Sequence, residues 1–215
     1  MNCCKSRQCQ GIEEIFNDSM AEGDLENYLK NGPSKDTGRL LDAIRERLPQ
    51  GFSLLDIGGG VGAIQHELAA AGAEAIINVD ASPAYSQVAQ AEAARRGYAE
   101  RASYHIGDFA QMGSELQQVD VVTLDRVICC YDDMPSLVQA AVERARRVMG
   151  LVYPRDAWYI RFGVALANLV MTVLRRRFRI YAHPTQEVER IIKAAGFARS
   201  FYHSGFFWQV AVYEK

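Results

Sequence analysis

A short apolar strand that ends in an acid and breaks into glycines is the feature that most constrains the fold. Residues 54–62 read Leu-Leu-Asp-Ile-Gly-Gly-Gly-Val-Gly. Glycines at the end of a strand let the backbone turn sharply and approach a ligand without a Cβ in the way. Asp56 lies just before them, where a carboxylate can bind a cationic or hydroxyl-rich ligand. The segment therefore predicts a site for a nucleotide-like cofactor at the edge of an α/β sheet.

Length and charge predict one compact domain with a small-molecule partner. The chain has 215 residues, of which 49% are hydrophobic, enough for one substantial core. The net charge is −2, which gives no global electrostatic case for nucleic acid or an anionic membrane as partner. No stretch reaches the roughly 18 uninterrupted apolar residues of a membrane span, so we expect no integral membrane segment.

The cysteines predict reduced thiols rather than disulfides or a metal site. The five residues are Cys3, Cys4, Cys9, Cys129 and Cys130. An odd count, with no secretory signal at the N-terminus, indicates the cytoplasm. The three N-terminal thiols lack the spaced pair and the fourth ligand that zinc or iron–sulfur sites require. We therefore expect no metal and a flexible, thiol-bearing N-terminus.

Strand-like and helix-like segments alternate along the chain, as a parallel α/β sheet requires. The expected strands cover residues 53–57, 75–79, 102–106, 119–124 and 150–153, and two aromatic strands follow within 197–213 around Ser204-Gly205. The expected helices cover residues 11–21, 24–30, 34–48, 62–72, 82–96 and 134–148. The pattern predicts a single doubly wound domain.

Each of the first four strands ends in or just before an acid. These acids are Asp56, Asp80, Asp108 and Asp125. Turns favour Asp, so each acid alone is explained by a cap or a turn. In an open α/β sheet, however, ligands bind at the carboxyl ends of the strands. Together with the glycines, the four acids predict one binding edge.

A dinucleotide is the rival cofactor. Gly58 to Ala63 satisfies the pattern G-x-G-x-x-G/A, and Asp80 lies close to the position of a ribose-binding acid. Three features disfavour NAD: Asp56 would face a pyrophosphate with no basic residue nearby in sequence, about fifty residues precede the motif, and the chain is too short for a separate substrate domain. An NAD(P)-dependent or a non-catalytic nucleotide-binding protein stays open as the alternative.

The motif Asp56-Ile57-Gly58-Gly59-Gly60-Val61-Gly62 resembles the D-x-G-x-G-x-G motif of class I S-adenosylmethionine-dependent methyltransferases. The resemblance extends over about residues 53–153 and implies a Rossmann-like seven-stranded sheet whose last strand is antiparallel. It also implies S-adenosylmethionine as cofactor and S-adenosylhomocysteine as product. The expected activity is in-line transfer of a methyl group to a small, partly apolar acceptor, for which positioning can supply much of the acceleration.

The resemblance also implies roles for individual residues. Asp80 would hold the ribose hydroxyls, and Asp108 and Phe109 would flank the adenine. Asp125 and Arg126 would line the methyl-transfer pocket. The full expected cofactor set is Asp56, Gly58, Gly59, Gly60, Asp80, Ala81, Asp108, Phe109, Asp125 and Arg126, with Tyr28 and Thr37 added by their position beside the Gly32-Pro33 break.

Two residues are candidates for a catalytic role on the acceptor side. Tyr131 follows the fourth strand, where it could touch the acceptor or the methyl group, although core packing explains it equally simply. His183 precedes a predicted helix and is the best general-base candidate among the four histidines. The alternative is an ordinary loop histidine without a catalytic role.

Two segments lie outside the expected sheet. Residues 1–50 are predicted to form a helical lid over the cofactor domain at 51–215. A helical insertion covers residues 157–181; its stretch 163–174 is apolar around most of its circumference and runs into four arginines. The simple interpretation is a buried or homodimer-forming helix with a solvated basic end. The functional alternative is a cover that selects an apolar acceptor, or a surface that meets a membrane-associated one. The arrangement is loosely similar to that of magnesium-protoporphyrin O-methyltransferases, a similarity that does not transfer their substrate.

Overall fold

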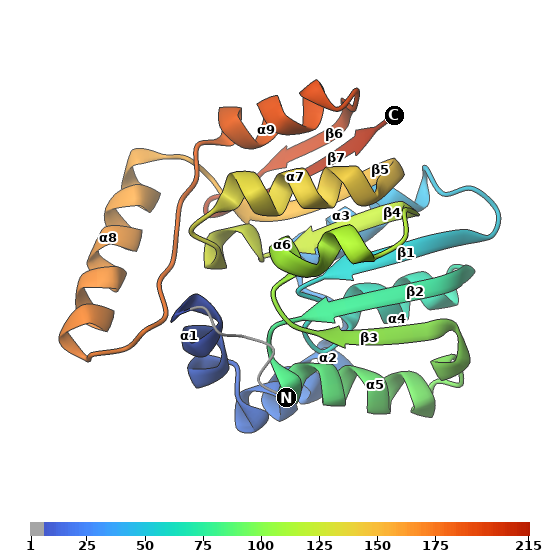
Figure 1. Ribbon diagram of the computed structural model, residues 1–215, viewed down its shortest axis with the longest axis horizontal. Helices are drawn as coiled ribbons and strands as arrows, with labels where there is room; N and C mark the ends of the chain where they lie inside the picture. Colours follow the sequence, from blue (N-terminus) through green and yellow to red (C-terminus); the bar gives the residue numbers. More distant parts are fainter. Residues whose placement is uncertain (1–6) are drawn as a thin grey trace.

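A seven-stranded mixed sheet forms the centre of the molecule (Figure 1). The computed structural model describes residues 7–215. The strand order is β3-β2-β1-β4-β5-β7-β6; β1 to β5 are parallel, and β7 runs antiparallel between β5 and β6. The strands are β1 Phe52–Ile57, β2 Ala73–Asp80, β3 Ala102–Ile106, β4 Val119–Asp125, β5 Ala145–Pro154, β6 Ala198–Ser204 and β7 Trp208–Glu214. The expected Rossmann-like sheet with an antiparallel last strand is confirmed.

Helices cover both faces of this sheet. One layer consists of α3 Lys35–Arg45, α4 Ala63–Ala70 and α5 Pro83–Arg95. The other consists of α6 Phe109–Met112, α7 Met134–Arg144 and α9 Thr185–Ala194 (Figure 1). Each face buries its own apolar cluster, because the central strands are buried on both sides. The result is a rigid three-layer platform for whatever lies at the strand ends.

The strand order reverses between β1 and β4, the two central strands. Asp56 of β1 lies opposite Asn78 of β2 on one side and opposite Thr123 of β4 on the other. This is the switch point at which open α/β sheets bind ligands. The glycine-rich turn therefore opens at the place where a crevice is expected.

Two further helices precede the sheet. They are α1 Arg7–Ile15 and α2 Asp18–Asn31. The single helix expected at 11–21 is wrong, because Asn17 interrupts it: its side chain accepts the backbone N–H of Met20 at 3.2 Å and caps α2. Of the segment expected as a lid, α3 packs on β5 and β7 as part of the sheet layer, whereas α1 and α2 lie at the carboxyl ends of the strands (Figure 1).

The helix expected at 134–148 is also too long. It ends at Arg144, and β5 begins at Ala145, which pairs with Val119 of β4. The alternation of buried and exposed residues that would mark a strand is absent in β5, since its last seven residues are all buried. Apolar runs of this kind cannot be divided between helix and strand by periodicity alone.

The insertion after β5 forms one long helix and a returning segment. Helix α8 spans Trp158–Val173 and stands beside the sheet rather than on it (Figure 1). Arg175, in the left-handed region at φ 55°, follows its end, and the chain then runs back toward α9. Within residues 7–215, no helix combines the length and the apolar character needed to cross a bilayer.

Candidate functional site

A cavity of about 540 Å³ lies at the carboxyl ends of β1, β2 and β4. Its floor is the sheet edge, and α1, α2, the segment after α8 and the β6–β7 turn enclose it. Thirteen of the fourteen residues expected in the site line it: Tyr28, Thr37, Asp56, Gly58, Gly59, Gly60, Asp80, Ala81, Asp108, Phe109, Asp125, Arg126 and Tyr131. His183 is not among the lining residues.

The glycine turn has a backbone that other residues rarely adopt. Gly58, Gly60 and Gly62 have φ values of 61°, 56° and 85°. A Cβ at Gly58 would lie 2.4 Å from Val127 Cγ2, so that glycine is required by packing. At Gly60 a Cβ would make only ordinary van der Waals contact, with Tyr85 Cδ1 at 3.7 Å, and the residue lines the cavity. The turn thus exposes bare backbone to the cavity at Gly60.

Asp80 fixes the shape of this turn. One carboxylate oxygen accepts the backbone N–H of Gly60 at 2.9 Å, and the other accepts that of Ser82 at 2.8 Å. Burial raises the pKa of Asp80, while hydrogen bonds from the backbone oppose that rise. Because a carboxylate has about four acceptor sites, both oxygens keep capacity for ligand hydroxyls.

Asp56 is a buried acid with one unsatisfied oxygen. Its Oδ1 accepts the hydroxyl of Thr123 at 2.7 Å, whereas its Oδ2 is buried with no hydrogen-bond partner. Burial raises the pKa of Asp56 to about 7, and the carboxylates of Asp125 and Asp80 add to the rise. A buried acceptor without a donor costs free energy, so this oxygen is positioned for a donor or a cation that the chain itself does not supply.

The glycine turn is supported from below by His66 of α4. The ring Nε2 lies 2.9 Å from the carbonyl oxygen of Val61, and Nδ1 contacts the Tyr98 hydroxyl. Burial lowers the pKa of His66 to about 4, so the ring is neutral at pH 7. This histidine holds the turn rather than facing the cavity.

Asp108 and Phe109 line the cavity just after the end of β3. Asp108 caps α6 by accepting the backbone N–H of Ala110 at 3.1 Å, and it also accepts the hydroxyl of Tyr131. Phe109 is buried beneath it. The hydroxyl of Tyr131 is therefore bound to the residue that follows β3 and is not free for another partner.

Asp125 and Arg126 fasten the start of α3 to the end of β4. The Thr37 hydroxyl donates to Asp125 Oδ2 at 2.6 Å, and Arg126 donates to Thr37 Oγ1 at 2.7 Å and to Ser34 Oγ at 2.6 Å. Arg126 has a left-handed φ of 61°, which directs its side chain back over this cluster. Both charged residues thus have partners within the chain, unlike the Oδ2 atom of Asp56.

The helices α1 and α2 are tied to the same edge by three hydrogen bonds. Ser82 donates its hydroxyl to the carbonyl oxygen of Phe16 at 2.6 Å, and Tyr85 donates to Asp24 at 2.5 Å. Tyr28 donates to Glu67 of α4 at 3.1 Å, and burial raises the pKa of Tyr28 to about 12. Tyr28 therefore presents its ring, not its hydroxyl, to the cavity wall.

Many other residues that line the cavity are apolar. They include Ile12, Phe16, Val127, Cys129, Pro154, Phe178, Ile180, Phe207 and Trp208. These side chains come from α1 and the residue after it, the turn after β4, β5, the segment after α8 and the β6–β7 hairpin. Val127 and Cys129 belong to the stretch after the fourth strand that the sequence places at the pocket floor. Sequence reasoning missed the others, because they are scattered apolar residues with no spacing that marks a site.

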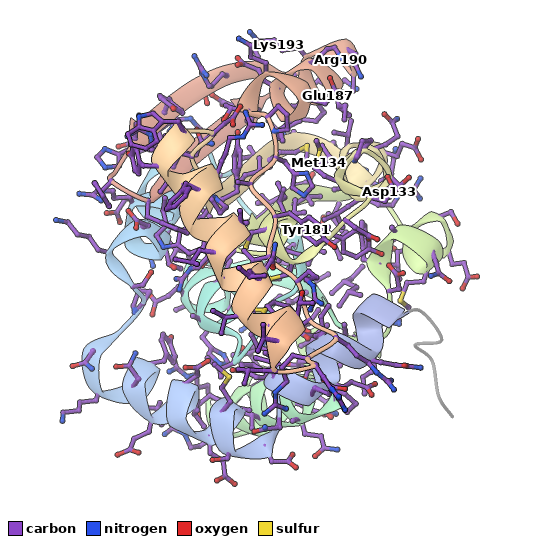
Figure 2. The ribbon with its side chains drawn as sticks, turned by 90° about the vertical axis from the view of Figure 1, so that its left-hand side faces the viewer. Asp133, Met134, Tyr181, Glu187, Arg190 and Lys193 are labelled. Carbon is purple, nitrogen blue, oxygen red and sulfur yellow. The ribbon has the colours of Figure 1, made fainter. Side chains whose placement is uncertain are left out.

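His183 lies behind this wall. Its Nε2 is 2.7 Å from the carbonyl oxygen of Tyr131, and burial lowers the pKa of the ring. The geometry connects His183 to the backbone of the Tyr131 loop. Figure 2 shows the neighbouring Tyr181 on the same segment, between α8 and α7.

Among residues 7–215, no group of His, Cys, Asp and Glu side chains could hold a metal ion. Cys3 and Cys4 lie outside the described residues, and so does the side chain of Cys9. The sulfur atoms of Cys129 and Cys130 lie 3.8 Å apart, and the hydrogen bond with Cys130, together with burial, raises the pKa of Cys129 well above its ordinary value. Cys129 is therefore protonated at pH 7 and packs as a small apolar group.

Comparison with known proteins gives one matching family model and many solved structures with a similar fold. Residues 55–151 match the family model of a methyltransferase domain. No curated protein sequence matches the chain significantly. Among solved structures, magnesium protoporphyrin IX methyltransferase of Synechocystis with bound S-adenosylhomocysteine superimposes with a TM-score of 0.70 at 19% identity, over 97% of this chain and 99% of that one.

Two further structures show how widely this fold is used. An O-methyltransferase family protein from Burkholderia thailandensis has a TM-score of 0.69 at 15% identity, over 95% of this chain and 62% of that one. The [4+2]-cyclase SpnF has a TM-score of 0.61 at 15% identity, over 82% of this chain and 80% of that one. At such identities the likeness establishes the fold and leaves the reaction to the site.

Proposed function

We propose that the chain is a class I S-adenosylmethionine-dependent methyltransferase that transfers the methyl group to a small, partly apolar acceptor. The observation that supports this proposal is one cavity whose lining combines acids and glycines at the strand ends with many apolar side chains. We assign the cofactor to the strand-end residues, the polar half, and the acceptor to the apolar residues, the apolar half.

The residues of the polar half fit S-adenosylmethionine. The buried Oδ2 of Asp56, which has no hydrogen-bond partner, suits a cationic donor. Gly60 presents backbone without a side chain to the cavity. We assign the backbone of Gly58, Gly59 and Gly60, with Ala81, to contact with the cofactor. Asp80 would accept the ribose hydroxyls, and Asp108 and Phe109 would border the adenine.

When bound, the sulfonium supplies an activated methyl group together with its leaving group. The chain's own task is then orientation and exclusion of water. The apolar wall keeps water away from the acceptor side, and the cluster of Thr37, Asp125 and Arg126 holds α3 against the cavity. Tyr131 is proposed to orient the acceptor along the line of transfer, with its hydroxyl anchored on Asp108.

His183 is proposed as a positioning residue. Its ring contacts the Tyr131 backbone from outside the cavity and would fix the loop that carries the tyrosine. The site residues that face the acceptor include no buried acid or histidine free to act as a base, which suits an acceptor that is already nucleophilic.

Calorimetric titration tests the donor assignment. We expect S-adenosylhomocysteine to bind and NADH to give no heat, since Asp56 disfavours a pyrophosphate. Binding of NADH without S-adenosylhomocysteine would instead support the dinucleotide alternative. Transfer of a tritium-labelled methyl group to members of a panel of apolar and polar small molecules then tests the acceptor side. Labelling of polar acceptors alone would contradict an apolar substrate.

A further inference from the structure

Helix α8 carries an exposed apolar stripe that no other part of the described chain covers. Trp158, Phe162, Leu166, Leu169, Val170, Val173 and Leu174 are all exposed, the first to 80%. They follow the spacing i, i+4, i+8, i+11, i+12, i+15 and i+16, which places them on one side of the helix. A continuous exposed apolar surface of this kind marks an interaction site.

The opposite side of α8 faces the protein. Ile160 is buried, and Asn168 brackets the returning segment: its amide donates to the Ile180 carbonyl at 2.7 Å and accepts the Ile180 N–H at 3.0 Å. Figure 2 shows α8 lying across the front of the molecule, over the helices and strand ends behind it. Its outward orientation is therefore fixed by contacts and is not a free rotation of the helix.

The stripe continues onto the β6–β7 turn. Phe206 is 80% exposed, and its ring stacks on Tyr159 with centroids 5.2 Å apart. The Tyr159 hydroxyl donates to the Phe206 carbonyl oxygen at 3.0 Å. We call Phe206 and the seven α8 residues together the α8 surface.

The charged side chains of the α8 segment itself have one sign. Residues 157–186 contain five arginines and no aspartate or glutamate, although the whole chain has a net charge of −2. The arginines are Arg161, Arg175, Arg176, Arg177 and Arg179. The neighbouring acids Asp156 and Glu14 lie 3.9 and 3.7 Å from Arg161 and Arg177, on exposed side chains where such pairs contribute little, and Arg177 also donates to Gln10.

An apolar stripe with arginines and no acids is complementary to an anionic lipid surface. Exposed Trp, Phe and Leu side chains enter the boundary between headgroups and acyl chains, and arginines bind the phosphate groups. A second copy of this chain fits less well, because it would bring the same basic segment against this one without an acidic counterpart. Charge therefore favours a membrane over the homodimer.

We propose that the α8 surface docks this protein on the face of a bilayer that contains anionic lipids, with α8 lying in the plane of the interface. The returning segment places Phe178 and Ile180 in the apolar wall of the cavity, so the docked face adjoins the acceptor half. The proposal concerns binding to lipid, and it stands or falls independently of methyl transfer.

Vesicle flotation of the full chain tests the proposal. We expect the protein to float with vesicles of phosphatidylcholine and phosphatidylglycerol at low salt and much less with phosphatidylcholine alone. The triple variant Phe162→Ser, Leu169→Ser, Val173→Ser should lower the partition coefficient at least tenfold, since three apolar anchors are lost. The double variant Arg175→Ser, Arg176→Ser should lower it by about fivefold per arginine and weaken its salt dependence.

Matched controls separate docking from general surface effects. Leu29→Ser removes an exposed leucine from α2. Arg190→Ser with Lys193→Ser removes two cations from α9 (Figure 2). Both controls should float like the unmodified protein, and circular dichroism should show all variants folded. Unchanged flotation of the triple variant would overturn the proposal. So would concentration-dependent dimerisation that the triple variant abolishes, in a protein that binds no vesicles.

Discussion

The two halves of the cavity are built in opposite ways. The polar half, which we assign to the donor, comes from the turns after β1, β2, β3 and β4 and contains acids and glycines. The apolar half, which we assign to the acceptor, is assembled mainly from apolar side chains of α1, the segment after α8 and the β6–β7 hairpin. We expect the polar half to select its ligand by hydrogen bonds to defined atoms and the apolar half to select its ligand by shape. Mutations in the two halves should therefore affect the binding of different ligands.

The largest expected effect is on the donor half, at Asp80. Replacement Asp80→Ala removes the acceptor for the Gly60 N–H and, by our assignment, for the ribose hydroxyls. We expect the affinity for S-adenosylhomocysteine to fall by about 1–3 kcal/mol, measured by calorimetry. Asp42→Ala, which removes an exposed acid farther along α3, serves as control. Equal affinity of the Asp80 variant and the unmodified chain would show that Asp80 is a turn residue alone.

Two glycine-to-alanine variants separate the effect of a Cβ on a ligand that approaches the backbone from the effect of backbone strain on stability. Gly60 and Gly97 both have left-handed φ values, 56° and 77°, and a Cβ at Gly97 meets no atom within 4 Å. Each alanine variant should lose about 1 kcal/mol of unfolding free energy in urea. Only Gly60→Ala should also weaken S-adenosylhomocysteine binding, by about tenfold or more, because its Cβ enters the cavity. Similar affinities in the two variants would contradict the assignment of Gly60.

The buried acid Asp56 predicts an effect on folding stability, not on ligand affinity, that depends on pH. Its pKa is about 7 in the folded chain against an ordinary value of 3.8, so folding takes up a proton between these pH values. The stability contributed by this group is fully present below about pH 4, decreases as the pH rises, and is lost above pH 7. Urea unfolding from pH 5 to 8 should show stability falling by up to about 1.4 kcal/mol per pH unit relative to Asp56→Asn. Parallel curves for the two proteins would exclude a raised pKa.

The smallest effect on the donor is expected from the acceptor wall. Ile180→Thr shortens the side chain and places a hydroxyl in this wall. Affinity for S-adenosylhomocysteine should stay within about twofold, while methyl transfer to an apolar acceptor should slow by about tenfold as its KM rises. A large loss of S-adenosylhomocysteine affinity would mean that the two halves are not separate.

The same division explains what the sequence could predict. Asp56, Gly58 and Gly60 belong to one continuous motif on a strand and turn, and Asp80 and Asp108 follow neighbouring strands at similar positions. Parallel strands bring such residues together by topology, so their meeting at one edge follows from the order of elements. The sheet, its antiparallel last strand and the gathering of these residues at one edge of the cavity were therefore predictable.

The acceptor half depends on contacts that no local pattern encodes. Phe16 and Phe178 pack edge to face with centroids 5.7 Å apart, although 162 residues of sequence separate them. Arg126 has partners in α3 that only tertiary structure provides. His183 illustrates the converse: a histidine beside a predicted helix is a reasonable base in sequence, but its ring lies behind the wall of the cavity.

The three hydrogen bonds that tie α1 and α2 to the sheet edge have a kinetic consequence. Ligand exchange through this side requires Ser82, Tyr85 and Tyr28 to release their partners to water, at about 0.5–1.5 kcal/mol for each bond. We therefore expect the residence time of a bound product to depend on how often these helices lift as well as on its own contacts. In that case side chains that hold the helices, rather than groups at the reacting atoms, would limit the rate of turnover.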